Sequence, residues 1–391
     1  MNAFQIIVIV LLLTILAVVL YNNWCIKQTY KMCSNFSSNV TKLSPTQSPT
    51  QSPTRSPTRS PTPININGLD GTPKDWIFML KLGTGGANCT INNGAYSCHF
   101  LYADSENPTV KLVTEFTVDS TDPKNPAYQF YQLCQNNTFV TWNDQGSIKS
   151  CAGASGYAHD KGGIVYNSQE GIYCQSSNPN WGFFDKGFLD AGTASHPGIQ
   201  TGLAQHLLFV KLNSQTDISN MVSLMNQANV CIMDGHIDGF NTCIVSGKCT
   251  GDYLSKNIGS LTVIAKPKGI IGDDAWGQLN KMYCGGVGMH VLSFCTPDCP
   301  LGTGKPTTSI NGIIDVKNDR NNPKSILNTT CTGLSFDSFS SNHSKIGSCD
   351  NNNKVIVGGN NHSTATQGAR GGLFVVIDNQ KFSDGIKCLF R

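Results

Sequence analysis

Two copies of a His-x-Lys motif constrain this chain more than any other feature. His159-Asp160-Lys161 lies near the middle of the chain and His343-Ser344-Lys345 lies near its end, so the histidines are 343 − 159 = 184 residues apart. On a β-strand, residues i and i+2 point to the same face, so each pair can direct both side chains into one cleft. Two such pairs predict a fold of two related halves with one shared site.

The chemistry of the two pairs indicates a phosphodiesterase. Imidazole has an ordinary pKa of ~6.5, so one ring can attack phosphorus while the other protonates the leaving oxygen. Lys161 and Lys345 would hold the phosphate oxygens. An isolated histidine is more often a surface or core residue, but pairing with lysine in both halves favours a catalytic role for His159 and His343.

Each copy lies within a longer pattern. The first copy reads GYAHDKGGIVY over 156–166 and is followed by GIYCQSSNPNW over 171–181. It resembles the signature GH-x-KG … GFW … HS-x-PNF of the deoxyribonuclease II family. The second copy reads NHSK over 342–345, then GGNN over 358–361 and QGARGG over 367–372. It resembles the family's DHSKW … GD-x-NRN … Q-x-RGGG.

Two further segments are similar to the same family. DWIFMLKL at 75–82 resembles its opening DWFVVYKLP, and AKPK at 265–268 with GDDAW at 272–276 resembles AKFSKFGDDLY. These matches are in chain order from about residue 66 to the end.

The chain also departs from the family pattern. Ile346, Leu373 and Asn342 replace a family tryptophan, glycine and acidic residue respectively, and the stretch between Cys295 and Cys331 does not align.

The resemblance implies both a fold and an activity. The fold is mixed α/β, a phospholipase D-like pseudodimer with halves at about 65–210 and 211–391. The activity is that of an acid, metal-independent endonuclease that hydrolyses the P–O5′ bond of double-stranded DNA and leaves 3′-phosphate ends. It acts without sequence preference and with no cofactor.

Candidate phosphate ligands surround the four motif residues. Amide, hydroxyl and guanidinium groups donate hydrogen bonds to phosphate, although asparagine is also a common turn residue. The candidates are Asn180, Asn361, Ser177, Gln367 and Arg370, with Lys266 and Lys268 as further cations. Asp273 and Asp274 are candidates to orient a catalytic group, and Gly-Asp-Asp is equally typical of a turn.

The N-terminus predicts a membrane anchor. Residues 4–21 form an uncharged apolar run of 18 residues, which is long enough to span a bilayer. A cleaved signal peptide is the alternative, but a basic start and a small-x-small cleavage site are both missing. We expect residues 1–24 to be a signal anchor, although Lys27 and Lys31 argue weakly for the opposite orientation.

A stalk follows the anchor. Ser-Pro-Thr recurs five times between residues 44 and 63. Regular proline excludes helix and sheet, and nothing apolar is available for burial. Residues 25–64 are therefore predicted to form an extended stalk, either O-glycosylated or a plain linker, and the catalytic domain is predicted over 65–391.

Cysteine content and sequons predict a non-cytosolic domain. The chain has sixteen cysteines and lacks the paired Cys-x-x-Cys spacing of a zinc ribbon, which favours disulfides. Asn-x-Ser/Thr sequons also indicate a glycoprotein. We expect Asn342 and Asn361 to remain bare because a glycan there would block the site, whereas the other sequons lie at Asn35, Asn39, Asn88, Asn136 and Asn328. A lysosome-like, extracellular or virion-surface location follows.

Regular elements are predicted from periodicity. Residues 217–229 have a helical pattern that begins with Asp217. The expected strands cover 76–82, 111–118, 164–166, 206–212 and 373–377.

Charge and motifs narrow the function classes. A net charge of +3 gives no broad basic face for nucleic acid, so a focused phosphate site is expected. No carboxylate cluster or His-Glu-x-x-His suggests a metal. Two alternatives remain open: a phospholipase D-type enzyme acting on another phosphodiester, and a surface glycoprotein that retains the fold without catalysis. The sequence does not indicate an oligomeric state.

Overall fold

A computed structural model describes much of the C-terminal part of the chain. The chain divides into two units, residues 1–60 and 61–391. No helix in the described ranges is long and apolar enough to cross a membrane. The expected anchor at 4–21 and the Ser-Pro-Thr repeats before residue 63 lie outside those ranges. The described residues are 63–83, 89–92, 95–144, 157–178, 192–193, 196–197, 202–241, 251–268, 275–286, 288–293, 313–316, 343–362 and 370–389.

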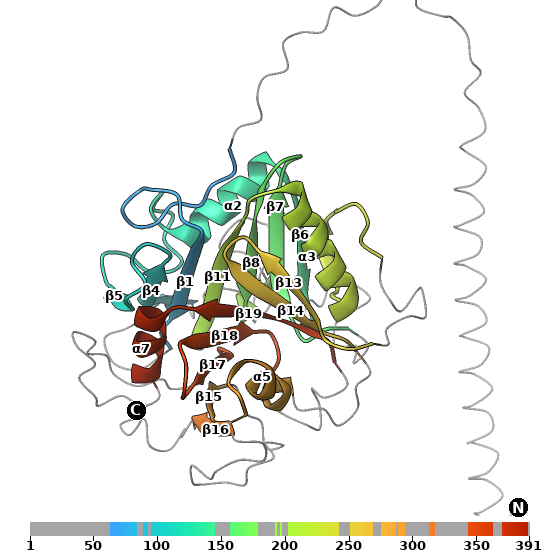
Figure 1. Ribbon diagram of the computed structural model, residues 1–391. Helices are drawn as coiled ribbons and strands as arrows, with labels where there is room; N and C mark the ends of the chain where they lie inside the picture. The colour runs from blue at the N-terminus through green and yellow to red at the C-terminus, as the bar shows by residue number, and fades with distance from the viewer. Residues whose placement is uncertain are drawn as a thin grey trace, which may run out of the picture. The chain divides into compact units, whose positions relative to one another are not determined.

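Two large sheets form the framework of the second unit (Figure 1). The first sheet is antiparallel throughout. In spatial order its strands are β12 (Ile232–Gly235), β6 (Thr138–Asn143), β7 (Lys161–Tyr166), β8 (Gly171–Ser176), β11 (Gln205–Leu212), β1 (Trp76–Lys81), β4 (Phe100–Asp104) and β5 (Lys111–Val113).

The second sheet is antiparallel except for its last pair, β15 and β16. Its strands in spatial order are β13 (Leu254–Ile258), β14 (Leu261–Lys266), β19 (Gly372–Asp378), β18 (Lys354–Gly358), β17 (Ile346–Cys349), β15 (Met289–Leu292) and β16 (Ile313–Val316). Two small hairpins are β2 (Cys89–Asn92) with β3 (Ala95–Cys98), and β9 (Gly192–Thr193) with β10 (His196–Pro197).

In the described ranges four helices accompany the sheets, and three of them begin at a side-chain cap. The helices are α2 (Pro126–Asn136), α3 (Gln215–Ala228), α5 (Ala275–Tyr283) and α7 (Gln380–Cys388). Asn125, Ser214 and Asn379 each accept a backbone N–H from the first turn of the helix that follows. Helix α3 ends at Asn229, which takes the left-handed conformation that closes many helices.

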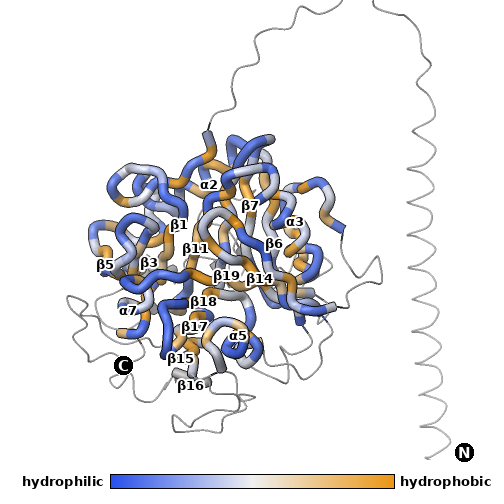
Figure 2. Tube along the Cα trace, in the orientation of Figure 1, coloured by the Kyte–Doolittle hydropathy of each residue, from blue (hydrophilic) through white to orange (hydrophobic). Residues whose placement is uncertain are grey.

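The two sheets pack face to face, and a helix covers the outer face of each. Alternation along β1 sends Phe78 into the core between the sheets and Ile77 into the core under α2. The central core also takes inward residues of β14, β18 and β19 together with side chains of α3 and α7. Beyond the second sheet, Trp276 of α5 packs against Phe374. Figure 2 shows apolar residues along the strands and polar residues along many of the connecting loops.

The same element order occurs twice along the chain. In the first sheet, β1, α2, β6, β7, β8, β11 and α3 follow one another, and in the second, β14, α5, β15, β17, β18, β19 and α7 do so. The spatial order β6-β7-β8-β11-β1 corresponds to β15-β17-β18-β19-β14. In each set a His-x-Lys motif directly precedes or enters the third strand, β7 or β17.

Most elements expected from the sequence are present. The strands expected at 76–82, 164–166, 206–212 and 373–377 correspond to β1, β7, β11 and β19, and the expected helix corresponds to α3. The expected strand over 111–118 was too long. It ends at Val113, because the Thr114 N–H bonds to the side chain of Glu115 instead of a neighbouring strand.

The boundaries also differ in two places. The half boundary expected near residue 210 falls inside β11, and the first sheet takes a further strand, β12, that ends at Gly235. Ile64, the last residue assigned to the stalk, is buried in the core under α2. Its backbone N–H bonds to Glu170, and its carbonyl accepts from Lys211. Packed structure therefore begins at least one residue before the expected start at 65.

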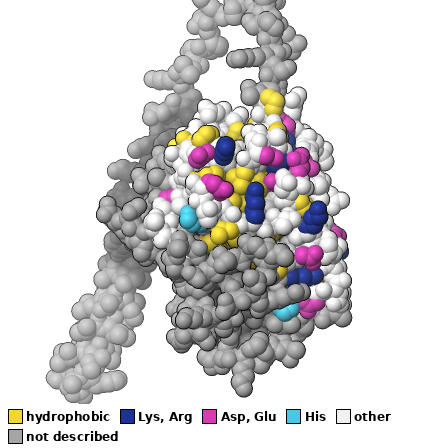
Figure 3. All heavy atoms as spheres, turned by 90° about the vertical axis from the view of Figure 1, so that its left-hand side faces the viewer, with side chains coloured by type: hydrophobic (Ala, Val, Ile, Leu, Met, Phe, Trp, Pro, Cys, Tyr) yellow, Lys and Arg dark blue, Asp and Glu magenta, His cyan; other side chains and the backbone are white. Residues whose placement is uncertain are grey.

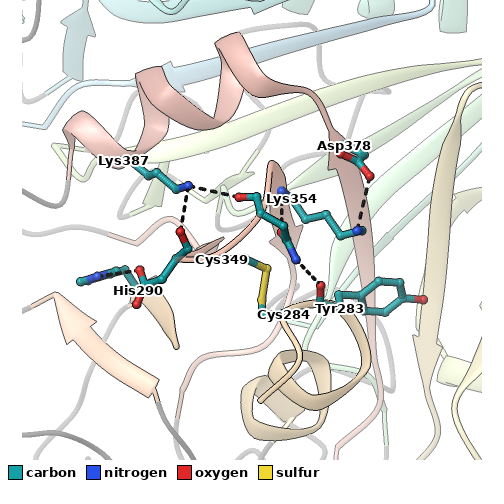
Figure 4. The surroundings of a disulfide bond; sticks show 9 residues. Tyr283, Cys284, His290, Cys349, Lys354, Asp378 and Lys387 are labelled. Carbon is teal, nitrogen blue, oxygen red and sulfur yellow. Dashed lines mark hydrogen bonds and ion pairs between the residues drawn. A yellow bond between two sulfur atoms is a disulfide. The ribbon is translucent and has the colours of Figure 1, made fainter. Parts of the chain in front are cut away.

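Disulfides are present, as expected from the cysteine content. Cys89–Cys98 closes the β2–β3 hairpin, and Cys284–Cys349 joins the end of α5 to the end of β17. Figure 4 shows that second bond among polar contacts from α7, β18 and β19: Lys387 donates to the carbonyl oxygens of Asp350 and Asn352, and Lys354 pairs with Asp378. These contacts fix β17 at the end opposite its His-x-Lys motif. Cys134 and Cys174 are buried free thiols.

Candidate functional site

One edge of the first sheet gathers polar side chains from four adjacent strands. The β6–β7 register pairs Asn143 with Lys161, so Asp144 continues β6 beside the first motif. The β7–β8 register pairs Lys161 with Ser176, which places Ser177 at the same edge. Beside it, the backbone N–H of Ser177, which follows β8, donates to the carbonyl of His206 on β11, and the N–H of His206 donates to Ser177 Oγ. The pairing register of these strands therefore brings Asp144 and His206 to one edge of the sheet, although they are more than sixty residues apart in the sequence.

The second sheet presents the corresponding edge. Lys345 directly precedes β17, and its carbonyl accepts the N–H of Gly358 at the end of β18. Gly359 follows β18 and bonds to the carbonyl of Leu373. Arg370 lies just before β19. The second motif, the glycine turn and the arginine thus lie at one end of the sheet.

Reciprocal backbone bonds join these two edges. The N–H of His159 donates to the carbonyl of Gly371 at 2.9 Å, and the N–H of His343 donates to the carbonyl of Ala204 at 2.7 Å. Gly371 directly precedes β19, and Ala204 directly precedes β11. Each motif is therefore anchored to the corresponding strand of the opposite sheet, which brings the two motifs together.

The ring of His159 is held in one tautomer. Its Nδ1 lies 2.7 Å from the carbonyl oxygen of Gly359, so Nδ1 carries the proton and Nε2 keeps its lone pair. Gly359 is required here because a Cβ would overlap the carboxylate of Asp160 and the carbonyl oxygen of His159. The arrangement leaves a neutral imidazole with an available Nε2, as a nucleophile requires.

Asp144 is the counterion of the site. Its carboxylate bonds to Lys161, pairs with the Arg370 guanidinium at 2.9 Å and lies 3.8 Å from His159 Nε2. Burial alone would raise the pKa of this carboxyl group, but the neighbouring charges, led by Lys161, hold it below its ordinary value. Asp144 is therefore ionised and fixes two cations beside the histidine.

Backbone contacts place Arg370. Its guanidinium donates to the carbonyl oxygens of Tyr157 and Ala158 at 3.0 and 3.2 Å, next to the first motif. The carbonyl of Arg370 accepts from the buried Lys266 at 2.9 Å. Lys266 thus holds the arginine in position from the end of β14.

Both imidazoles are neutral. Burial lowers the pKa of His159 to about 3 although the charge of Asp144 opposes the shift, and burial with the charges of Lys345 and Lys161 lowers the pKa of His343 to about 2. Burial and the charge of Lys161 also hold the pKa of Lys345 well below its ordinary value. The charges of Lys161 and Lys345 both lower the pKa of His159 and that of His343, so the four motif residues lie close together.

Asp160, the central residue of the first motif, joins the two sheets. Its carboxylate accepts Trp142 Nε1–H at 2.7 Å, Gln175 Nε2–H at 3.1 Å and the backbone N–H of Leu373 at 3.0 Å. Burial raises its pKa to about 6, although all three hydrogen bonds oppose the shift. This carboxylate connects β6 and β8 to β19 and is structural.

Several buried polar atoms at this junction have no hydrogen-bond partner among the described residues. They are His206 Nε2, Asn178 Oδ1, Asn361 Oδ1 and both side-chain polar atoms of Asn360. Buried polar atoms are nearly always paired, and an unpaired group calls for an explanation such as a ligand. Their position beside the motifs is that expected of a polar ligand site.

The predictions for individual site residues compare differently with the structure. The structure brings together His159, Lys161, His343, Lys345 and Arg370, as just described. The strand geometry expected for the motifs was wrong: His159 precedes β7, and residues 343–345 all precede β17. Cross-sheet backbone bonds, rather than strand alternation, set their direction.

The remaining candidates are three residues that the structure describes and four that lie outside the described ranges. The hydroxyl oxygen of Ser177 accepts the N–H of His206 at 2.9 Å, which ties it to β11. Asn361 follows the glycine turn, and Lys268 is half-buried after β14. Asn180, Gln367, Asp273 and Asp274 lie outside the described residues.

The sequence patterns missed Asp144 and His206. Asp144 follows an apolar strand at no recognisable spacing from either motif. His206 begins an expected strand, and a histidine at the start of that strand's apolar run was the one available signal.

No metal cluster is evident in the described part of the chain, and one face of the molecule carries charges of both signs (Figure 3). No three His, Cys, Asp or Glu side chains there are grouped to hold a metal ion. Figure 3 shows acidic and basic side chains interspersed over the described portion of one face.

Comparison with known families identifies one match. Residues 66–241 match the family model described as Deoxyribonuclease II. The matched range contains the first His-x-Lys motif, Asp144 and His206, and it ends before the second motif. A comparison with curated proteins found no match.

Proposed function

We propose that the chain, of which residues 66–241 match the Deoxyribonuclease II family model, belongs to that family and is an acid, metal-independent endonuclease on double-stranded DNA. The observation that carries this proposal is the reciprocal anchoring of the two motifs. His159 and His343 are each bonded to the opposite sheet, and both lysines lie with them. One phosphate between the sheets would contact both halves of the site.

His159 is the proposed nucleophile. Because its Nδ1–H is committed to the Gly359 carbonyl, its Nε2 lone pair can attack phosphorus. A bond forms between Nε2 and phosphorus, and the P–O5′ bond breaks. His343 gives its proton to the departing O5′. In the second step His343 takes a proton from water, whose oxygen attacks phosphorus and releases a 3′-phosphate and neutral His159.

The buried cations would stabilise the phosphorane-like transition state. Lys161, Lys345 and Arg370 would donate hydrogen bonds to the non-bridging oxygens. Fixed cations of this kind supply the charge stabilisation that a metal ion provides in other nucleases. The proposal therefore needs no metal.

Acid dependence follows from the electrostatics. His343 must carry a proton to act as an acid, yet burial and the nearby lysines lower its pKa to about 2 in the ligand-free site. An anionic phosphodiester would offset the lysine charges and raise this pKa. Substrate binding would then be accompanied by proton uptake, which is easier at low pH.

The repeated element order supports a phospholipase D-like pseudodimer. We propose that the sets β1 to α3 and β14 to α7 are related by a pseudo-twofold axis through the site. The disulfides support a non-cytosolic location, and the apolar run at 4–21 supports attachment to a membrane.

Plasmid nicking tests the proposed function. The full chain, produced under oxidising conditions, should nick supercoiled plasmid at pH 5 in EDTA and leave ends that a 3′-phosphatase can dephosphorylate. Phosphatidylcholine in a parallel reaction should remain intact. Hydrolysis of the lipid without DNA cleavage would contradict the nuclease proposal, as would strict dependence of nicking on added Mg²⁺.

A further inference from the structure

His206 is a buried histidine with a defined position at the junction of the two sheets. Its N–H donates to Ser177 Oγ at 2.9 Å, and its carbonyl accepts the Ser177 N–H at 3.1 Å. Its side chain is fully buried. The backbone of β11 therefore fixes the ring at the edge where the two motifs meet.

The second motif fixes the tautomer of this ring. Nδ1 of His206 accepts the backbone N–H of Lys345 at 3.2 Å, so Nδ1 is unprotonated and Nε2 carries the hydrogen. Nε2 is buried and has no hydrogen-bond partner within the part of the chain that the structure describes. A buried N–H without an acceptor is unfavourable and is rarely left in place without a function.

The charges around His206 indicate which kind of acceptor would suit its Nε2–H. Burial, followed by the charges of Lys345 and Lys161, holds the pKa of His206 well below its ordinary value, so the ring stays a neutral donor. Both lysines are near enough to act on it and are themselves hydrogen-bond donors. Three neighbouring donors of this kind are suited to an anionic oxygen.

We propose that His206 Nε2–H donates a hydrogen bond to the substrate phosphate and is an additional phosphate-binding residue of the site. The inference rests on the proposed function, since it assumes that a phosphate binds beside the two lysines. It also assigns a second task to one ring: Nδ1 positions Lys345, and Nε2 contacts the ligand. The equivalent position on β19 is Leu373, whose carbonyl accepts from Gly359 as that of His206 does from Ser177, so this donor occurs on one side of the site.

Two substitutions separate the two tasks of the ring. In His206→Asn the amide oxygen can occupy the place of Nδ1 and still accept the Lys345 N–H, but the distal donor is lost. In His206→Gln the amide nitrogen can occupy the place of Nε2, while the acceptor for Lys345 is lost. His236→Asn is the matched control, because His236 is an exposed histidine paired only with Asp238.

Binding of inorganic phosphate by the folded full chain is measured by calorimetry at pH 5. We expect His206→Asn to bind phosphate about 10- to 100-fold more weakly than wild type, as for loss of a hydrogen bond to a charged group. His206→Gln should stay within about threefold, and the control should be unchanged. Wild-type affinity in His206→Asn would overturn the inference, and so would equal losses in the Asn and Gln variants.

A measurement on the wild-type chain covers the case in which a variant does not fold. The His206 Nε2–H proton should be visible by NMR, protected from exchange, and should shift when phosphate is added. A resonance that phosphate leaves unmoved would overturn the inference. Phosphate binding needs no turnover, so a chain that fails to cut DNA refutes the proposed function without removing this test.

Discussion

Substitution of Asp144 by asparagine tests the electrostatic balance of the site. The change keeps the size of the side chain and removes the negative charge that pairs with Lys161 and Arg370. The Asp144 side chain is only 2 % exposed, so solvent cannot replace that charge. The expected result is a less stable protein whose stability depends on added anions.

The magnitude follows from the geometry. At an effective dielectric constant near 20, the 2.9 Å pair with Arg370 corresponds to about 6 kcal/mol of attraction before desolvation is deducted. Breaking a buried pair by removing one partner costs about 3–5 kcal/mol, because the remaining charge stays buried. The unfolding entropy is about 0.7 kcal/mol/K for a unit of this size, so Tm should fall by about 4–7 °C.

Calorimetric melting of the full chain with and without phosphate is the assay. Phosphate can take the place of the missing carboxylate, so it should raise the Tm of Asp144→Asn more than that of wild type. Asp238→Asn is the control, since its carboxylate is fully exposed. The assignment of Asp144 as counterion is refuted if Asp144→Asn has the same Tm as the Asp238→Asn control. It is also refuted if phosphate raises the Tm of Asp144→Asn and that of wild type equally.

Four further predictions concern the histidines and Asp160. His159→Ala and His343→Ala should each nearly abolish plasmid nicking at pH 5 in EDTA, and the double variant should be little worse because the rings act as a unit; additive losses would contradict this. Of the two, His343→Ala should retain cleavage of a p-nitrophenyl diester, whose leaving group needs no proton; retention by His159→Ala instead would reverse the roles. The lowered pKa of His343, about 2, predicts proton uptake when phosphate binds at pH 5; binding heats that do not vary with the ionisation enthalpy of the buffer would exclude it. Folding raises the pKa of Asp160 from 3.8 to about 6, so the folded state binds the extra proton between these values and gains stability as pH falls. The stability advantage of wild type over Asp160→Asn should widen by up to about 3 kcal/mol between pH 7 and pH 4 in denaturant titrations, and a constant gap would contradict this.

The sequence was sufficient to predict the strands that are buried on both faces. Strands such as β1 and β19 are buried on both faces, so they read as apolar runs, and their positions were predicted within a residue or two. The duplicated motif also predicted four residues that the structure brings close together, because its two copies lie in equivalent places of a repeated element order.

The counterion and the additional histidine could not be predicted in the same way. Asp144 meets Lys161 because Asn143 pairs with Lys161 across β6 and β7, and nothing local in the sequence records that register. The contact of His206 with Lys345 spans 139 residues and the two sheets. Such contacts depend on how two sheets pack, which residue spacing along one strand does not determine.

The range that matches the family model does not contain all the residues that position His159. The match ends at residue 241, yet His159 depends on residues beyond it: its N–H bonds to Gly371 and its Nδ1–H bonds to Gly359. His343 depends equally on Ala204 in the matched range. The inner face of the first sheet is also buried by β14, β18 and β19. A fragment limited to the matched range would expose that apolar face and leave His159 without its orienting carbonyl, so the smallest unit that can form the proposed site includes both sheets.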